Sequence, residues 1–492
     1  MNALTRTMGR VAEGLAPAAS GYRLVAWVFL RLLALTYLAA FASLAVQITA
    51  LAGSEGIFPI GEQLSRATEL FGDLRFVSYP SLFWLAPQDW ALRLIAWGGC
   101  GLSLLLLVGW RERTVLILLY LCYLSLFLAG QIFLNFQWDY LLLETGFVAI
   151  FLPGGSRVTV WLFRWVLFKL RFLSGLSKVL SGDLAWRGLT ALDHYFETQP
   201  LPHIGSWYAH WLPEWLHRVG TAGTLFVELI VPFFMFLPRP WRLFAAWATI
   251  LWQILIIATS NHNFFNLLTI VLCLFLFDDR AVARVLPAGI TRRMTAASPL
   301  PERPRPAVAI TAVVAALVVV PASIVSATEM ATGPLGLASR LNDWIEPYRI
   351  ANRYHVFPKI ETERIAMQVE ASLDREHWVP IDFRYAPDDP SQAPAFIVPH
   401  QPRVDWMLWF VPMSPVFLDW FERFLDRLVA GSPSVTALLA QPPFAEKPPQ
   451  MLRVSVYRYR FATPVERAEK GIWWTREYLG PFQPLPVVQA KH

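Results

Sequence analysis

Charged residues are scarce in this 492-residue sequence. Aspartate, glutamate, lysine and arginine make up 16% of it, whereas 55% of the residues are hydrophobic. A typical soluble domain is about 25% charged. The composition therefore argues against an ordinary soluble domain and favours a protein whose solvent is a lipid bilayer. The net charge of +6 is modest and lies in separated segments, so it does not indicate nucleic-acid binding.

Cysteine is also rare. Cys100, Cys122 and Cys273 all lie in apolar runs, and no two of them form a Cys-x-x-Cys pair. We therefore expect buried, unreactive thiols, no metal site and no dithiol for redox exchange. A cleaved signal peptide is not expected either, since residues 1–20 contain charges and no continuous apolar core.

Long apolar runs are abundant instead. A helix that crosses the hydrocarbon core of a bilayer, about 30 Å thick, needs about 20 mostly apolar residues. The fold class that we expect is a polytopic α-helical membrane protein with about nine spans. These spans lie near residues 22–50, 91–109, 114–131, 137–153, 158–177, 220–238, 241–259, 263–278 and 306–328.

Lysine and arginine are distributed unequally between the two sides that nine spans create. The N-terminal side and its helix ends receive 15 of them, and the other side receives 5. Because basic residues concentrate in cytoplasmic loops, residues 1–21 and the basic, proline-rich linker 279–305 are expected in the cytoplasm. The membrane bundle then comprises residues 22–278 and a last helix at 306–328, and the C-terminal region lies outside the cytoplasm.

The sequence pattern changes after the last span. Apolar residues alternate with polar ones over 365–371 and again over 379–385, with a turn-like stretch between them, which predicts a β-hairpin. Residues 452–456 predict a third strand, and residues 415–430 fit an amphipathic helix. We expect residues 340–480 to form an extracytoplasmic domain of mainly β character.

Several ionisable residues fall inside the expected spans or at their edges. A charge in hydrocarbon is expensive, so such residues face the interior of the bundle and are candidates for function. Chain direction places most of them in the outer half of the bilayer. They are Asp139, Glu144, Lys169, Arg171, Lys178, Glu228 and His262.

We expect four of these residues to line one outward-facing polar cavity. Asp139 and Lys178 would lie near the outer surface as the functional pair. Glu144 would pair with Arg171 below them as a structural clamp. The alternative is a set of buried ion pairs that only fix the register of the helices.

Two further regions could contact a client or join the two domains. The stretch 178–219 is dense in tryptophan, histidine and proline, which predicts an interfacial cap on the outer membrane surface or, alternatively, a catalytic loop. Its histidines lack the spacing of a metal site. The turn Pro399–Arg403 is rigid because proline presets φ, and Arg403 or Asp405 is expected to contact the membrane part. The contact candidates are Trp138, His194, His400, Arg403 and Asp405.

Several motifs resemble those of the lipase maturation factor family. They are NFQWDYLLLETG at 135–146, FKLRFLSG at 168–175, LDHYFETQPLP at 192–202, NRYHVF at 352–357 and PHQPRVDW at 399–406. The resemblance covers residues 22–480. It implies a membrane-anchored, chaperone-like factor whose partners are a secreted lipase-like client and membrane lipid. The expected location is a bacterial inner membrane with the C-terminal domain in the periplasm, or the endoplasmic reticulum membrane if the source is eukaryotic.

A second resemblance suggests a different function. Residues 175–179, followed by Asp183 and Trp186, are similar to a stretch of the transmembrane fold of vitamin K-dependent γ-carboxylase. That similarity would make Lys178 a catalytic base, with Asp139 nearby, in a membrane enzyme. Whether the chain is an enzyme stays open, with the maturation factor preferred. No cofactor is expected, although the cavity allows for a bound lipid. A transporter ranks last because no internal repeat is found.

Overall fold

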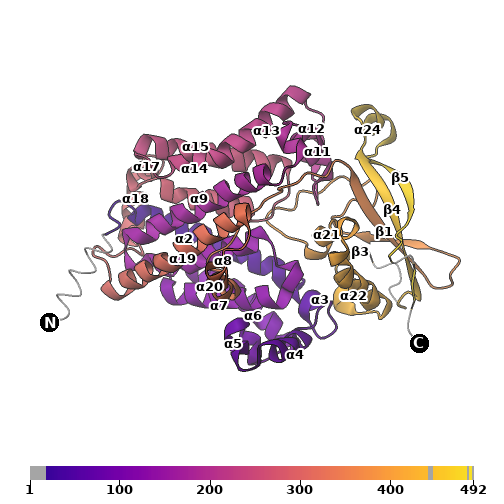
Figure 1. The fold of residues 1–492 in the computed structure, drawn as a ribbon, viewed down its shortest axis with the longest axis horizontal. Coiled ribbons are helices and arrows are strands. Elements are labelled where there is room, and N and C mark those ends of the chain that lie inside the picture. The colour runs from indigo at the N-terminus through magenta and orange to yellow at the C-terminus, as the bar shows by residue number, and fades with distance from the viewer. Residues whose placement is uncertain (1–17, 442–446, 485–486, 490–492) are drawn as a thin grey trace.

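The computed structural model describes residues 18–441, 447–484 and 487–489. Residues 1–17 of the expected cytoplasmic N-terminus lie outside this part of the chain. A bundle of helices forms most of the molecule, and a C-terminal domain with a β-sheet lies at one end of it (Figure 1). The described chain begins at the opposite end of the bundle (Figure 1).

Within the described residues, five helices are long and apolar enough to cross a membrane. Their backbone polar groups are satisfied within each helix, and their leucine, alanine, valine and aromatic side chains suit hydrocarbon. They are α2 (Arg23–Ala45), α6 (Asp89–Val108), α7 (Glu112–Gly130), α15 (Arg239–Thr259) and α19 (Pro306–Thr332).

The expected count of nine spans is not confirmed. The other four predicted spans are short, interrupted or rich in basic residues: α8 has only 13 residues, and α9 contains five lysines and arginines. Such helices are tolerated where the rest of the protein covers them, and 11 of the 13 residues of α8 are buried. These elements are α8 (Gln137–Ala149), α9 (Arg157–Leu180), α13 (Glu214–Leu229) with α14 (Val231–Phe234), and α16 (Phe265–Leu272) with the 3₁₀ turn Cys273–Leu276.

Short helices cover the two ends of the bundle. On the side of the C-terminal domain these are α3 (Ile48–Ala52), α4 (Ile60–Phe71), α5 (Arg75–Ser78), α10 (Leu184–Arg187), α11 (Ala191–Thr198) and α12 (Ile204–His210). At the opposite end are α17 (Asp279–Ala283) and α18 (Ala288–Ala296) (Figure 1). A further short helix, α20 (Leu337–Ile345), follows α19.

The segments predicted to share the N-terminal side meet at one end of the bundle. The Asp279 carboxylate accepts hydrogen bonds of 2.9, 2.9 and 3.0 Å from three N–H groups in the first turn of α2. Arg239, which begins α15, pairs with Asp278 at 2.6 Å, and the Arg305 N–H donates to the Gly154 carbonyl at 2.9 Å. The loops that were counted together on the basic, N-terminal side therefore lie together at one end of the bundle.

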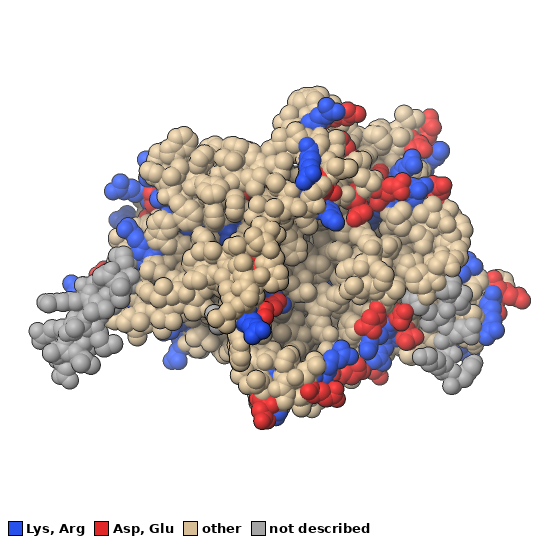
Figure 2. Space-filling model, viewed as in Figure 1, with Lys and Arg blue, Asp and Glu red and all other residues tan. Residues whose placement is uncertain are grey.

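Charged side chains gather at the two ends of the face shown in Figure 2. One group lies at the end that carries α17 and α18, and the other lies over the C-terminal domain and the helices beside it. The surface of the bundle between these groups carries few charges. A band with few charges between two more charged ends suits a protein that crosses a bilayer.

The C-terminal domain is built on an antiparallel sheet in the order β3-β2-β1-β4-β5, with β6 also paired to β4. The predicted hairpin is present, with Val369 of β1 opposite Ile381 of β2. The predicted third strand is part of β4, which pairs with β1 along nine positions. The strands are β1 (Arg364–Ser372), β2 (Val379–Phe383), β3 (Leu439–Gln441), β4 (Met451–Phe461), β5 (Trp474–Pro481) and β6 (Val487–Gln489).

Helices also contribute to this domain. The predicted amphipathic helix is α22 (Leu418–Val429), and its apolar face buries Trp420, Phe421 and Phe424. A short helix that the sequence pattern does not predict, α21 (Arg403–Leu408), lies between the sheet and the bundle (Figure 1). The domain is therefore an antiparallel sheet covered by helices.

The two ends of the molecule should be accessible from opposite sides of a membrane. Arg292 lies exposed on α18, and Glu376 lies exposed in the β1–β2 turn. We expect a cysteine at position 292 to react with a membrane-impermeant maleimide only after the membrane is opened. A cysteine at position 376 should react in intact cells or in vesicles of the matching orientation. Labelling of both positions from one side would contradict this arrangement.

Candidate functional site

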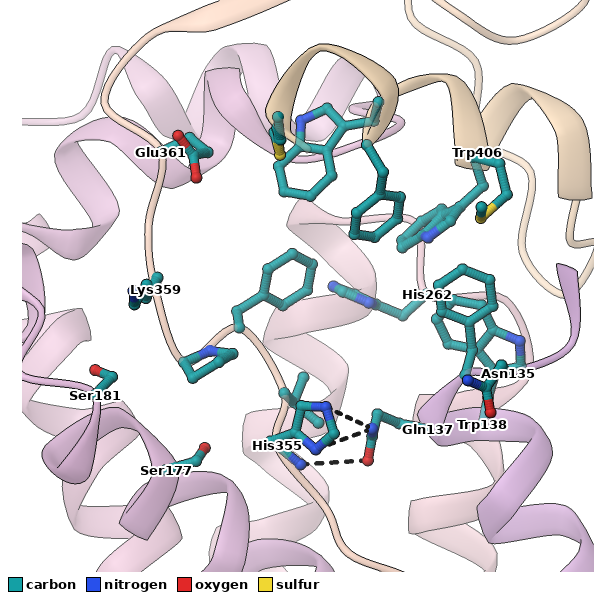
Figure 3. A pocket seen from close by; sticks show the side chains of 18 of the residues that line it. Asn135, Gln137, Trp138, Ser177, Ser181, His262, His355, Lys359, Glu361 and Trp406 are labelled. Atoms are coloured by element: carbon teal, nitrogen blue, oxygen red, sulfur yellow. Dashed lines mark hydrogen bonds between the residues drawn. The ribbon is translucent and has the colours of Figure 1, made fainter. Parts of the chain in front are cut away.

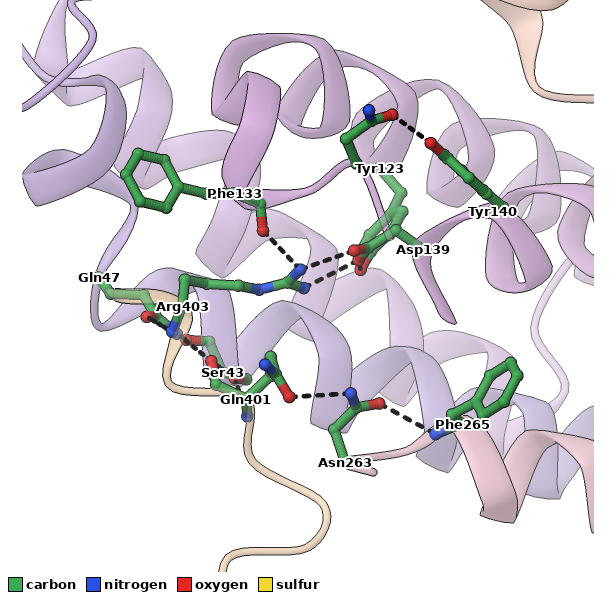
Figure 4. A network of polar contacts seen from close by, with 11 residues as sticks. Ser43, Gln47, Tyr123, Phe133, Asp139, Tyr140, Asn263, Phe265, Gln401 and Arg403 are labelled. Carbon is green, nitrogen blue, oxygen red and sulfur yellow. Dashed lines mark hydrogen bonds and ion pairs between the residues drawn. The ribbon is translucent and has the colours of Figure 1, made fainter. Parts of the chain in front are cut away.

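Arg403 joins the C-terminal domain to the bundle. Its guanidinium is fully buried and makes two parallel contacts with the Asp139 carboxylate, Nη1–Oδ2 at 2.6 Å and Nη2–Oδ1 at 2.8 Å (Figure 4). Nη1 also donates to the Phe133 carbonyl at 2.9 Å, and the Tyr123 hydroxyl donates to Asp139 at 2.6 Å. This bidentate geometry is the one that best offsets the cost of burying two charges.

Neutral hydrogen bonds surround this ion pair. The Arg403 N–H donates to Gln47 Oε1 at 2.9 Å, and Gln47 Nε2 donates to the Gln401 carbonyl at 2.8 Å. Asn263 Nδ2 donates to Gln401 Oε1 at 2.9 Å. Segments from the start of the bundle, from its eighth predicted span and from the C-terminal domain therefore meet in one network (Figure 4).

Two other contact candidates lie at the same junction. His400 Nδ1 lies 2.9 Å from Ser43 Oγ on α2. Trp138 on α8 packs edge-to-face against Trp406 on α21, with ring centroids 5.1 Å apart. These contacts place the turn before α21 directly against the helical bundle.

Asp405 contacts its own domain rather than the bundle. Its Oδ1 accepts hydrogen bonds from the N–H groups of Tyr385 at 2.8 Å and Ala386 at 3.2 Å, so it fixes the loop after β2. Its side chain points this way because Asp405 follows Arg403 by two residues on a helix and therefore faces a different direction. His194 lies half-buried on α11.

A segment between α20 and β1 lies across the bundle and reaches its charged interior. We call residues 349–361 the strap. Asn352 Nδ2 and the Tyr354 hydroxyl donate to Glu144 Oε2 at 3.2 and 2.8 Å. Lys169 pairs with the other oxygen of the same carboxylate. Glu144 is fully buried, and partners from two separate segments, α9 and the strap, satisfy its oxygens.

Lys178 belongs to a third buried cluster. Its Nζ lies 2.8 Å from Glu228 Oε2 and donates to the Val356 carbonyl of the strap at 2.7 Å. It also lies 5.0 Å from the centre of the Trp186 ring. Arg171 Nη2 approaches the other oxygen of Glu228 at 3.4 Å. The strap therefore contacts two of the three buried clusters.

The pairing predicted from chain depth is wrong. Glu144 pairs with Lys169 instead of Arg171, and Lys178 and Asp139 have different partners in separate clusters. Depth along a helix does not determine direction: residues two apart, such as Lys169 and Arg171, point about 200° apart around the axis. The four residues predicted to share one cavity are therefore divided among three clusters, and only Arg171 and Lys178 line a common cavity.

A cleft of about 710 Å³ lies between α8, the strap and the segment that begins with α21 (Figure 3). We call it the aromatic cleft because rings and methionines dominate its lining, whereas polar side chains such as Gln137, Lys359 and Glu361 are fewer. His262 also lines it, and its Nε2 lies 2.7 Å from the Tyr195 hydroxyl. The tryptophans, phenylalanines and methionines of the lining are Phe136, Trp138, Phe265, Met330, Phe357, Trp406, Met407, Trp409, Phe410, Met413 and Phe417.

Comparison with known families identifies both parts of the chain. The model described as "Lipase maturation factor transmembrane domain" matches residues 24–284. The model described as "Lipase maturation factor C-terminal domain" matches residues 350–484. The chain belongs to the lipase maturation factor family. The second match begins inside the strap, so the strap is part of what the family's C-terminal domain contributes.

Individual relatives cover nearly the whole chain. Lipase maturation factor 2 of Xenopus laevis is 33% identical over 583 aligned positions, which cover 94% of this chain and 82% of the relative. Lipase maturation factor 1 of Mus musculus is 34% identical over 506 positions, covering 94% and 87%. Lipase maturation factor 2 of Homo sapiens is 32% identical over 599 positions, covering 94% and 83%. No solved structure matches.

The sequence did not lead us to predict most of the residues that line the aromatic cleft. The positions around Trp409, Phe410 and Met413 follow the PHQPRVDW motif directly, and their density of large apolar residues was the available signal. The strap donates hydrogen bonds to Glu144 and accepts one from Lys178. Its only sequence signal was the NRYHVF motif, which is weaker. Neither stretch has a helix or strand period that would have predicted its direction.

Replacing Arg403 by alanine should lower stability by about 3–5 kcal/mol, because Asp139 would stay buried and charged without its partner. Arg423 on α22 provides a matched control, since it pairs with Glu62 of α4 at 3.2 Å but is partly exposed. Arg423→Ala should cost about 0–1 kcal/mol. Thermal unfolding in detergent, followed by tryptophan fluorescence, compares the two variants. Equal losses would contradict the claim that burial makes the Arg403 pair decisive.

The Asp405 carboxyl should make stability depend on pH. Burial raises its pKa to about 6, although the two backbone N–H groups oppose that rise. The folded state therefore binds the proton more tightly than the unfolded state, whose pKa is about 4, and stability falls as pH rises through this window. Asp405→Asn keeps the acceptor oxygen and removes the titration. We expect wild type to lose about 2 kcal/mol relative to this variant between pH 4 and pH 7. Parallel pH profiles of the melting temperature would contradict this.

Proposed function

We propose that this chain is a membrane-anchored, chaperone-like maturation factor that assists the folding or assembly of a secreted lipase or a similar client. The names of its relatives support the proposal, since those proteins are lipase maturation factors. The observation in this chain that carries it is the aromatic cleft, which presents apolar side chains where the C-terminal domain meets the bundle.

The chemistry of the aromatic cleft suits an unfinished protein surface. Methionine side chains are flexible and polarizable, so they adapt to partners of different shape, and aromatic rings supply large apolar contact areas. A volume of about 710 Å³ accommodates a few apolar side chains of a client segment. The Arg403–Asp139 pair holds α21 in place, so this wall of the cleft is formed before a client arrives.

We further propose that the aromatic cleft faces the extracytoplasmic side, where a secreted client folds. The grouping of basic residues at the end that carries α17 and α18 supports this side for the C-terminal domain. The relatives described above are vertebrate proteins. They support an integral membrane protein and give no support to a bacterial inner membrane or a periplasm.

The alternative of a γ-carboxylase-like enzyme with Lys178 as its base is not favoured. A general base must reach the proton that it removes and must have a free lone pair. Lys178 is buried and donates to Glu228 and to the Val356 carbonyl, so its amine is committed to structural contacts. The matching relatives are named for lipase maturation rather than for carboxylation.

A charge placed in the aromatic cleft should strongly reduce client maturation without unfolding the protein. Met413 lines the cleft and is 38% exposed, so Met413→Glu leaves the core intact but makes the apolar surface polar. We expect the yield of active secreted lipase, measured in cells that lack their own maturation factor, to fall about tenfold, the loss expected from removing one strong interface contact.

Val416→Glu is the matched control for this experiment. Val416 lies three residues further along, is 75% exposed and is not part of the cleft lining. This variant should mature the lipase as well as wild type does, at equal amounts of folded protein. Full activity of Met413→Glu, or equal loss in both variants, would refute the aromatic cleft as the client site.

A further inference from the structure

A second cavity, of about 190 Å³, lies beside the aromatic cleft and between α13 and α15. His262 and Phe357 line both and stand between them. Leu255 lines the smaller cavity while 47% of it is exposed on the apolar outer surface of α15, so the cavity opens toward the membrane. Facing helix surfaces form its walls, Gly220, Thr224 and Glu228 from α13 and Trp252, Ile256 and Thr259 from α15.

Two buried amides leave polar atoms unused in this cavity. Asn266 Nδ2 donates to Gln253 Oε1 at 2.7 Å, and both side chains are at least 98% buried. Among the residues that the structure describes, Gln253 Nε2 and Asn266 Oδ1 have no hydrogen-bond partner. Turning both amides over still leaves one donor and one acceptor free. Because unpartnered buried polar atoms are costly and rare, the unused donor of this amide pair indicates a ligand that accepts a hydrogen bond.

The charged side chains that line this cavity do not balance. Arg171 and Lys178 from α9 contribute two positive charges, and Glu228 contributes one negative charge. Within the described part of the chain, Arg171 Nε and Nη2 have no hydrogen-bond acceptor, although Nη2 lies 3.4 Å from Glu228. The clusters around Arg403 and Glu144, by contrast, each pair one cation with one carboxylate. A buried excess of one positive charge favours a ligand with one negative charge.

We propose that this cavity binds a single-chain lipid with a carboxylate head, a fatty-acid anion that enters from the membrane between α13 and α15. The carboxylate accepts hydrogen bonds from Arg171 and Gln253 and neutralises the excess charge. The acyl chain lies along Trp252 and Leu255 and leaves through the opening toward the bilayer. The volume suits one chain better than a two-chain phospholipid. The site is separate from the aromatic cleft and does not rest on the proposed function.

Binding of radiolabelled palmitate to the full-length protein in non-ionic detergent tests this site. We expect about one palmitate per protein, and hexadecanol, which has the same chain without the charge, should compete about tenfold more weakly. Leu255→Trp fills the opening and should weaken palmitate binding about tenfold. Leu251→Trp is the matched control, since Leu251 lies one turn away on the same helix, is 58% exposed and is outside the cavity lining.

Arg171→Gln separates charge recognition from simple filling of space. This variant should lose the preference for palmitate over hexadecanol, a readout that a structural defect alone would not change. Equal palmitate binding by wild type, Leu255→Trp and Leu251→Trp would place the lipid on the general surface and overturn the proposal. Equal competition by hexadecanol, or displacement of palmitate by phosphatidylcholine at equal concentration, would overturn the assignment of a single-chain carboxylate.

Discussion

The buried pair of Arg403 and Asp139 is the contact on which the rest of this structure depends. Asp139 lies in the first turn of a short helix inside a membrane protein, where an unpaired carboxylate would be very costly. Its partner comes from a domain 264 residues further along the chain. Glu144, one turn and a half deeper on α8, likewise receives Asn352 from 208 residues away. The bundle and the C-terminal domain are therefore not independent modules, because the domain and the strap supply hydrogen-bond and ion-pair partners for two buried carboxylates of the bundle.

This dependence explains how the aromatic cleft acquires its shape. The Arg403 pair fixes α21, and the strap is fixed by its contacts to Glu144 and Lys178. The cleft lies between these two attachments and the start of α8. Its aromatic and methionine side chains thus line an open cleft on a rigid frame instead of collapsing onto one another. The smaller cavity beside it shares the strap as a wall, so both sites form only when the domain is docked.

Sequence patterns predicted the parts of the fold that local periodicity controls. The five apolar helices, the β1–β2 hairpin, β4 and α22 all follow from the length or spacing of apolar residues. The count of about nine spans is not confirmed, because α8, α9, α13 and α16 carry charges or breaks. Their buried charges, such as Glu144, Lys169 and Glu228, are tolerated only because the assembled bundle surrounds them. The buried charges were correctly singled out as residues of the interior. Their partners were not predictable, because helix rotation and the path of the strap decide which side chains meet.

Hydrogen–deuterium exchange of Arg403→Ala against wild type tests the central claim most directly. If the ion pair docks the domain, exchange in the variant should rise in α21, in the turn before it and in the strap. The β1 and β4 amides, which are bonded within the sheet, should stay protected. Unchanged protection of α21 and the strap would show that other contacts dock the domain. It would contradict the account in which this one buried pair holds the aromatic cleft together.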